Sequence, residues 1–137
     1  HFAYNEGRFR IQAQAGQLAQ PMPTVQAALR AYASHYLRRR MAHWAEVTEL
    51  SPARVAIKHH RSKWGSCSSK RNINLNWHLV LQPKEVADYV MVHELMHLHE
   101  MNHSSRFWDW VRYYLPAYQE AKRYLRQHQW VIDVYQP

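Results

Sequence analysis

Two histidines frame a glutamate in the run His93-Glu94-Leu95-Met96-His97. On a helix, residues four apart lie on the same face, so both imidazoles can reach one metal ion at about 2.0–2.1 Å. The carboxylate of Glu94 can then reach a zinc-bound water without being a ligand itself. This spacing predicts a mononuclear zinc hydrolase in which Glu94 is the general base.

A third histidine follows this pattern closely. Catalytic zinc usually takes three protein ligands and leaves the fourth position to water. His103 lies six residues after His97, where the chain can turn back once the helix has ended. His99 is the competing candidate, but it lies only two residues after His97, which points it to another side of the helix. We therefore expect one Zn²⁺ per chain, held by His93, His97 and His103.

Further motifs lie on both sides of the His-Glu pattern. They are, in order, Lys63-Trp64-Gly65-Ser66-Cys67-Ser68, Ile73-Asn74-Leu75-Asn76, His93 to Leu98, Asn102-His103-Ser104 and Phe107-Trp108. Together they resemble the YgjP-like zinc metallopeptidases, which are related to the SprT-like and WLM metalloproteases. The resemblance spans residues 25–127. It implies an α+β fold with a zincin-like core of the minimal gluzincin type, zinc on His93, His97 and His103, and Glu94 as general base.

Hydrophobic periodicity predicts the helices that must position these residues. The first runs from Thr24, a plausible N-cap, to about Leu50, and the helix that carries the motif runs from about Lys84 to Glu100. Two shorter helices are expected at Arg106–Tyr114, capped by Ser104 or Ser105, and at Ala117–Gln127. Phe107, Trp108 and Trp110 are expected to pack against the motif helix.

Two segments, residues 54–60 and 72–77, alternate apolar and polar side chains as half-buried strands do. Because a polar turn centred on Gly65 separates them, we expect a small antiparallel hairpin beside the motif helix. Residues 72–77 are then the candidate edge strand that binds substrate backbone by strand addition, with Asn74 and Asn76 as candidate substrate-binding residues. An ordinary half-buried strand is the alternative interpretation.

The turn between these strands is strongly basic. Lys63 and Arg61 are candidate substrate-binding residues, since a cation facing the metal can stabilise an anionic transition state or bind phosphate. A solvated loop is the alternative. Across all 137 residues, 18 Lys and Arg against 10 Asp and Glu give a net charge of +8, which favours polyanionic partners such as nucleic acid.

The domain organisation expected from these patterns is simple. Residues 1–23 form a strand, around Phe9 and Ile11, and a connector; because the chain starts at His1, we expect them to end a missing upstream region. Residues 24–130 form the zincin-like metallohydrolase domain, and 131–137 form a tail. No apolar run is long enough to span a membrane, and a single Cys suggests a reducing, cytoplasmic location.

Several functions are compatible with such a site. The first is peptide hydrolysis by a Glu-activated, zinc-bound water. The second keeps the site but takes a phosphorylated small molecule, making the protein a nucleotide pyrophosphatase. A DNA-associated protease of the SprT or WLM kind is the third. A nucleic-acid-binding module with a structural zinc is disfavoured, because structural sites are closed by four ligands.

Overall fold

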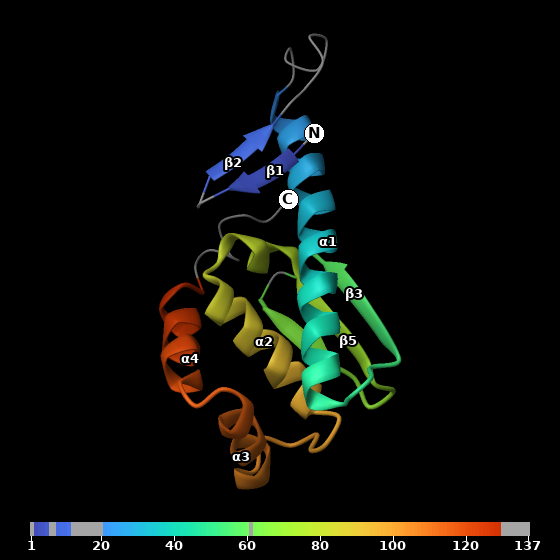
Figure 1. The fold of residues 1–137 in the computed structure, drawn as a ribbon, viewed down its shortest axis with the longest axis vertical. Coiled ribbons are helices and arrows are strands. Elements are labelled where there is room, and N and C mark those ends of the chain that lie inside the picture. Colours follow the sequence, from blue (N-terminus) through green and yellow to red (C-terminus); the bar gives the residue numbers. More distant parts are fainter. Residues whose placement is uncertain (1, 6–7, 12–20, 61, 130–137) are drawn as a thin grey trace.

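The computed structural model describes residues 2–5, 8–11, 21–60 and 62–129 (Figure 1), so the connector expected at 12–20, Arg61 and the tail at 131–137 lie outside the described residues. Its elements are β1 (Phe2–Asn5), β2 (Arg8–Ile11), α1 (Pro21–Thr48), β3 (Arg54–Lys58), β4 (Gly65–Cys67), β5 (Asn72–Asn76), the 3₁₀ helix η2 (Trp77–Leu81), α2 (Lys84–Met96), α3 (Ser105–Tyr114) and α4 (Tyr118–Gln127). This mixture of helices and a small sheet confirms the α+β class. Among the described residues, no helix combines the length and apolarity needed to cross a membrane.

The three strands beside the helices form one sheet in the order β3-β5-β4. Strand β3 runs parallel to β5, with Val55 opposite Ile73, whereas β4 runs antiparallel to it, with Cys67 opposite Ile73. The expected antiparallel hairpin between residues 54–60 and 72–77 is therefore wrong. A parallel pair needs a long crossover connection. The segment expected as a polar turn forms this connection, and it includes strand β4.

Strand β5 is consequently the central strand and not an edge. Its backbone groups pair with β3 on one side and with β4 on the other, and Ile73 and Leu75 are completely buried. A substrate backbone cannot add to a strand whose two sides are already paired. The expectation that residues 72–77 offer an edge to substrate is therefore also wrong, and the edge on this side of the sheet belongs to β4.

Helix α2 lies at the centre of the molecule, between α1 and α4 in Figure 1, and also contacts α3 and the sheet. Because neighbours cover it on most sides, its buried residues extend around the helix rather than along one stripe. It ends at Met96, with His97 as its C-cap, earlier than the expected end at Glu100. The next residues tighten into i→i+3 turns, in which the amide of Leu98 donates to the carbonyl of Leu95.

The other helices follow their local signals closely. Helix α1 begins at Pro21, before the expected cap at Thr24, because proline is well tolerated in a first turn. It ends where Glu49 adopts a left-handed backbone with φ of 58°. Ser104 caps α3, as expected, since its hydroxyl accepts a hydrogen bond of 3.3 Å from the amide of Phe107.

The arginine run on α1 has structural contacts that account for part of the positive charge. The Arg40 guanidinium pairs with both carboxylate oxygens of Asp88 on α2, at 3.1 and 2.8 Å. Arg38 donates to the backbone carbonyl of Val55 in β3 at 2.8 Å. Two cations of this run therefore join α1 to α2 and to the sheet.

Burial of His78 in η2 predicts a pH-dependent stability. Its ring is fully buried and lies 3.1 Å, Nδ1 to Oδ1, from Asn76. Burial, with smaller contributions from His59 and Arg30, lowers the pKa of His78 from 6.5 to about 4. Between these values the unfolded chain binds a proton that the folded protein does not. The free energy of unfolding should therefore fall as pH drops from about 6.5 to 4, by up to about 3 kcal/mol from this group.

Urea unfolding between pH 4 and pH 7.5 tests this expectation. A His78→Gln variant should be less stable at pH 7 but should show a shallower loss of stability toward acid than the original chain. Its matched control is His35→Gln, because His35 is exposed on α1. If both variants lose stability with acid as steeply as the original chain does, the pKa shift assigned to His78 is wrong.

Candidate active site

Helix α2 and the loop after it bring three histidines together. His93 on α2 and His97, the C-cap of this helix, lie one turn apart, and the loop that follows returns His103 to the same point. The ligand atoms of the three residues all lie within 4.8 Å of one another, and the Nε2 atoms of His93 and His103 are 3.2 Å apart. His99, the competing candidate, is not in this group; it is exposed and its ring stacks on Trp110 at 4.4 Å.

This arrangement fits a tetrahedral metal ion. Two nitrogens bound to one zinc at about 2.0–2.1 Å lie roughly 3.3 Å apart at the tetrahedral angle, close to the distance between His93 and His103. Two of the other ring nitrogens are used elsewhere, because Nδ1 of His97 lies 3.0 Å from the carbonyl of Glu100 and Nδ1 of His93 lies 3.4 Å from the hydroxyl of Tyr89. The Nε2 atoms of His93 and His97 are therefore left for the common point.

Aromatic side chains from α3 hold the imidazoles in place. Phe107 is fully buried, stacks on His97 with a centroid distance of 4.5 Å, and meets both His93 and His103 edge-on at 5.0 Å. Trp108 also contacts the rings of His93 and His103, with centroid distances of 5.7 and 6.0 Å. These contacts confirm the expected packing of Phe107 and Trp108 against the motif helix.

Burial sets the protonation of the groups at this site. It lowers the pKa of His93 to about 3, with His97 and His103 adding to the effect, and it also lowers the pKa of His97. Neutral imidazole is the form that binds a metal. Burial raises the pKa of Glu94 to about 8, while the charge of Lys63 acts in the opposite direction. A further cation nearby would favour the carboxylate in the same way as Lys63 does.

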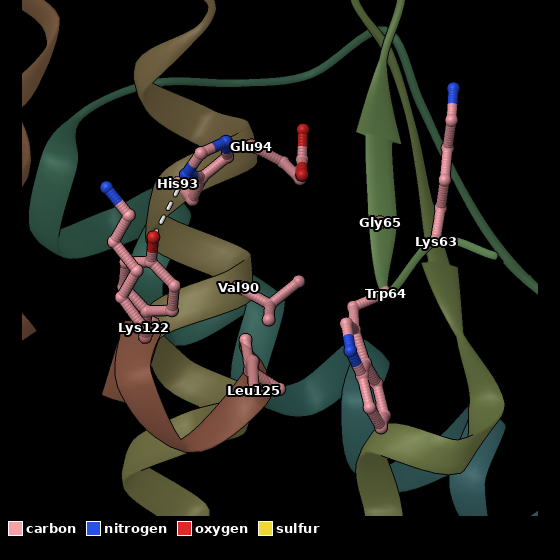
Figure 2. A pocket seen from close by; sticks show the side chains of 9 residues that line it. Lys63, Trp64, Gly65, Val90, His93, Glu94, Lys122 and Leu125 are labelled. Carbon is pink, nitrogen blue, oxygen red and sulfur yellow. Dashed lines mark hydrogen bonds between the residues drawn. The ribbon is translucent and has the colours of Figure 1, made fainter. Parts of the chain in front are cut away.

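Two cavities meet at His93 and Glu94. The first, which we call the histidine cavity, has a volume of about 330 Å³ and also contains His97 and His103. The second, which we call the Trp64 cavity, measures about 260 Å³ and lies between α2, α4 and the segment that enters β4 (Figure 2). Glu94 points toward β4 in this view and lines both spaces. Its carboxyl is therefore available to a molecule bound in either cavity.

Gly65 allows β4 to approach α2 closely enough to form these cavities. A Cβ atom at this position would lie 3.1 Å from Cγ1 of Val90 and 3.2 Å from Cγ of Glu94. It would also lie 3.2 Å from the carbonyl oxygen of Asn74. Because these distances are tighter than ordinary contacts, a side chain here would push the strand and the helix apart.

The candidate substrate-binding residues are placed differently from one another. Lys63 lines both cavities, whereas Arg61 lies outside the described residues. Asn76 is fully buried, and its amide nitrogen donates to the carbonyls of His60 and Lys63 at 3.1 and 3.0 Å. Asn74 donates to the hydroxyl of Ser66 on β4 at 3.2 Å. The two asparagines therefore hold the sheet and its loop together, and neither lines the two cavities.

Two further residues reach the site without having been singled out in the sequence. Tyr89 precedes His93 by four residues, so helical spacing alone could have indicated its contact. Lys122 enters from α4 and lines the Trp64 cavity, and no local signal links it to residues so distant in sequence. Glu100 orients His97 through its backbone carbonyl, while its side chain pairs with Arg106 at 3.4 Å.

The contact between Tyr89 and His93 predicts a change in metal affinity. Tyr89→Phe keeps the ring, which stacks on Tyr118, but removes the hydroxyl that orients the imidazole. We expect zinc affinity to fall by about 10-fold, the lower end of the effect of such orienting groups. Competition with a chromophoric chelator measures it. Tyr113→Phe is the matched control because Tyr113 is 73% exposed, and an equal loss in both variants would exclude the orienting role.

The protein shares its fold with solved structures of metallopeptidases. The metallopeptidase zymogen abylysin of Pyrococcus abyssi is similar to 68% of this chain over 95% of its own, with 23% identity and a TM-score of 0.59. The metallopeptidase zymogen jannalysin of Methanocaldococcus jannaschii is similar to 67% of this chain over 95% of its own, with 22% identity and a TM-score of 0.59. A family model described as YgjP-like, metallopeptidase domain, matches residues 4–128, so the chain belongs to the YgjP-like family. No curated protein matches it.

Proposed function

We propose that the protein is a mononuclear zinc-dependent peptidase in which Glu94 is the general base. The observation that carries this proposal is the convergence of three oriented imidazoles with a buried carboxyl in one cavity, on a fold shared with metallopeptidases. In this proposal His93, His97 and His103 hold the ion. Bound zinc would supply a Lewis acid that lowers the pKa of a water molecule and polarises the attacked carbonyl.

The side chains around the three histidines have two further roles, proton transfer and positioning of the imidazoles. Glu94 takes a proton from the attacking water and delivers it to the amine of the leaving peptide. Its burial, with only 6% of its surface exposed, keeps bulk water from competing for that proton. Phe107 and Trp108 fix the imidazoles, so little reorganisation is needed when substrate binds.

The edge of β4 is the proposed place for the substrate backbone. Gly65, Ser66 and Cys67 are half-buried and line the histidine cavity or adjoin it, and β5 pairs with only one side of this strand. An extended peptide can add to such an edge through main-chain hydrogen bonds. Strand addition at β4 would place a peptide beside Glu94, which is the role first expected of residues 72–77.

A parallel turnover screen tests the proposed function. Zinc-loaded protein is offered unfolded polypeptides and, separately, nucleoside triphosphates, with and without double-stranded DNA. We expect cleavage of polypeptide, loss of that cleavage with a zinc chelator, and no release of pyrophosphate. Turnover of triphosphates without peptide cleavage would overturn the proposal in favour of a pyrophosphatase, whereas peptide cleavage that requires DNA would indicate a DNA-associated protease.

A further inference from the structure

The residues that lead into β4 reach the site without regular structure of their own. Among the described residues between β3 and β4, which are 59–60 and 62–64, none belongs to a helix or a strand. Yet Lys63 lines both cavities, Trp64 lines one of them, and Gly65 begins β4. In Figure 2 these three residues follow one another on the strand side, opposite Glu94 on α2. The position of residues 62–65, which we call the cavity segment, therefore depends on contacts with other parts of the fold.

One buried residue binds the backbone around this segment at three points. Asn76, at the end of β5, is fully buried, and its side-chain amide donates to the carbonyls of His60 and Lys63 at 3.1 and 3.0 Å. Its backbone amide donates to the carbonyl of Trp64 at 2.9 Å. A carbonyl that loses its donor away from water costs free energy. Three carbonyl groups beside the two cavities thus depend on one residue.

The oxygen of the same side-chain amide fixes its orientation. It accepts a hydrogen bond of 3.0 Å from the backbone amide of His78 and lies 3.1 Å from Nδ1 of that residue. A reversed amide would set its oxygen against two carbonyl oxygens, so one orientation satisfies every group. Ionised aspartate has nearly the same shape as asparagine but offers no donor to the carbonyls of His60 and Lys63.

We propose that Asn76 is a positioning residue for peptide hydrolysis, holding the cavity segment where the edge of β4 can bind a peptide. This inference rests on the proposed peptidase function and adds a residue to it. Asn76 then acts through residues 62–65 and not by the substrate contact expected from the sequence. The histidine cluster is formed by α2 and the loop after it, so the metal ligands do not depend on Asn76.

Asn76→Asp tests this role because it keeps the shape and removes the donors. If the cavity segment occupies its binding position only a tenth of the time, the apparent affinity for peptide falls 10-fold, while the bound complex reacts as before. With zinc-loaded protein we therefore expect KM to rise by about 10-fold, the effect of losing about one buried hydrogen bond. The kcat value and the zinc content should stay close to those of the original chain.

Leu37→Ala is the control for a general loss of stability. Leu37 is fully buried in α1 and lines neither cavity, so its truncation weakens the core without touching the cavity segment. This variant should unfold at lower urea concentration but keep the original KM. An equal rise of KM in both variants, or no rise in Asn76→Asp, would overturn the positioning role and leave the peptidase function intact.

Hydrogen exchange followed by mass spectrometry gives a readout that needs neither peptide nor hydrolysis. In Asn76→Asp the amides of residues 62–67 should exchange about 10-fold faster while those of α2 keep their rate, whereas Leu37→Ala should not single out this segment. Unchanged exchange at residues 62–67 would contradict the proposal. Faster exchange there, in a protein whose original chain cleaves no peptide, would count against the peptidase function and retain the dependence of the segment on Asn76.

The original chain supplies a test that does not depend on the folding of a variant. Peptide that binds only the positioned segment should slow the exchange of the Asn76 side-chain amide protons, because binding and positioning are linked. Nuclear magnetic resonance of the ¹⁵N-labelled, zinc-loaded protein measures this rate with and without a slowly cleaved peptide. The exposed side-chain amide of Gln119 is the internal control. Exchange at Asn76 that stays constant while peptide is bound would overturn the inference.

Discussion

Replacing Glu94 with Gln should lower kcat/KM for peptide hydrolysis by about 10²- to 10⁴-fold, the range supplied by a positioned general base. The amide has nearly the same shape as the carboxyl, so the close approach of β4 to α2 at Gly65 should be preserved. It cannot accept the proton of the attacking water. Zinc content should stay at about one ion per chain, because Glu94 is not in the histidine cluster.

Glu85→Gln is the matched control for this experiment. Glu85 lies in the first turn of the same helix, is exposed, and does not line either cavity at His93. Activity should be unchanged in this variant, and metal analysis should give the same zinc content in both. A Glu94→Gln protein that retains full activity with its zinc bound would exclude Glu94 as the base.

Removing one imidazole of the cluster should have the second large effect. His103→Ala should weaken zinc binding by more than about 100-fold, beyond the usual effect of orienting groups, since a ligand itself is lost. Because His103 is exposed, this truncation leaves no buried cavity, and the unfolding transition of the metal-free protein should barely change. His97→Ala should lose zinc equally but should also be less stable, as His97 is buried against Phe107.

His99→Ala is the comparison that makes this result specific. His99 lies in the same turn region but stacks on Trp110 outside the cluster. The zinc affinity and activity of the His99→Ala protein should therefore match those of the original chain. Titration with a competing chelator measures all three variants. If His99→Ala loses zinc while His103→Ala retains it, the assignment of the third ligand must be exchanged.

The features that sequence predicted well are those that depend on local geometry. The pairing of His93 with His97 follows from the pitch of a helix, and the cap at Ser104 follows from a side chain next to the amide it binds. The contact of Phe107 with the imidazoles also follows, because an apolar residue early in α3 has to cover α2. Local periodicity therefore gave the helices and the candidate cluster.

The features that could not be predicted from the sequence depend on partners distant in the chain. Alternation shows that residues 54–58 and 72–76 are strands but not whether they pair parallel, since both arrangements bury the same alternate side chains. Asn76 reads as a polar strand residue, yet its amide is consumed by two loop carbonyls. Lys122 looks like any lysine of an amphipathic helix until α4 is docked beside the site.

The missing side chain at Gly65 has a consequence for how the site could be altered. At this position the strand that would hold a peptide approaches α2 so closely that a Cβ atom would meet both Val90 and the Cγ methylene group of Glu94, the proposed base. The close approach of β4 to α2 at this glycine would therefore set both the height of the peptide above α2 and the distance from that peptide to the Glu94 carboxyl. Any residue larger than glycine at position 65 would change both distances at once.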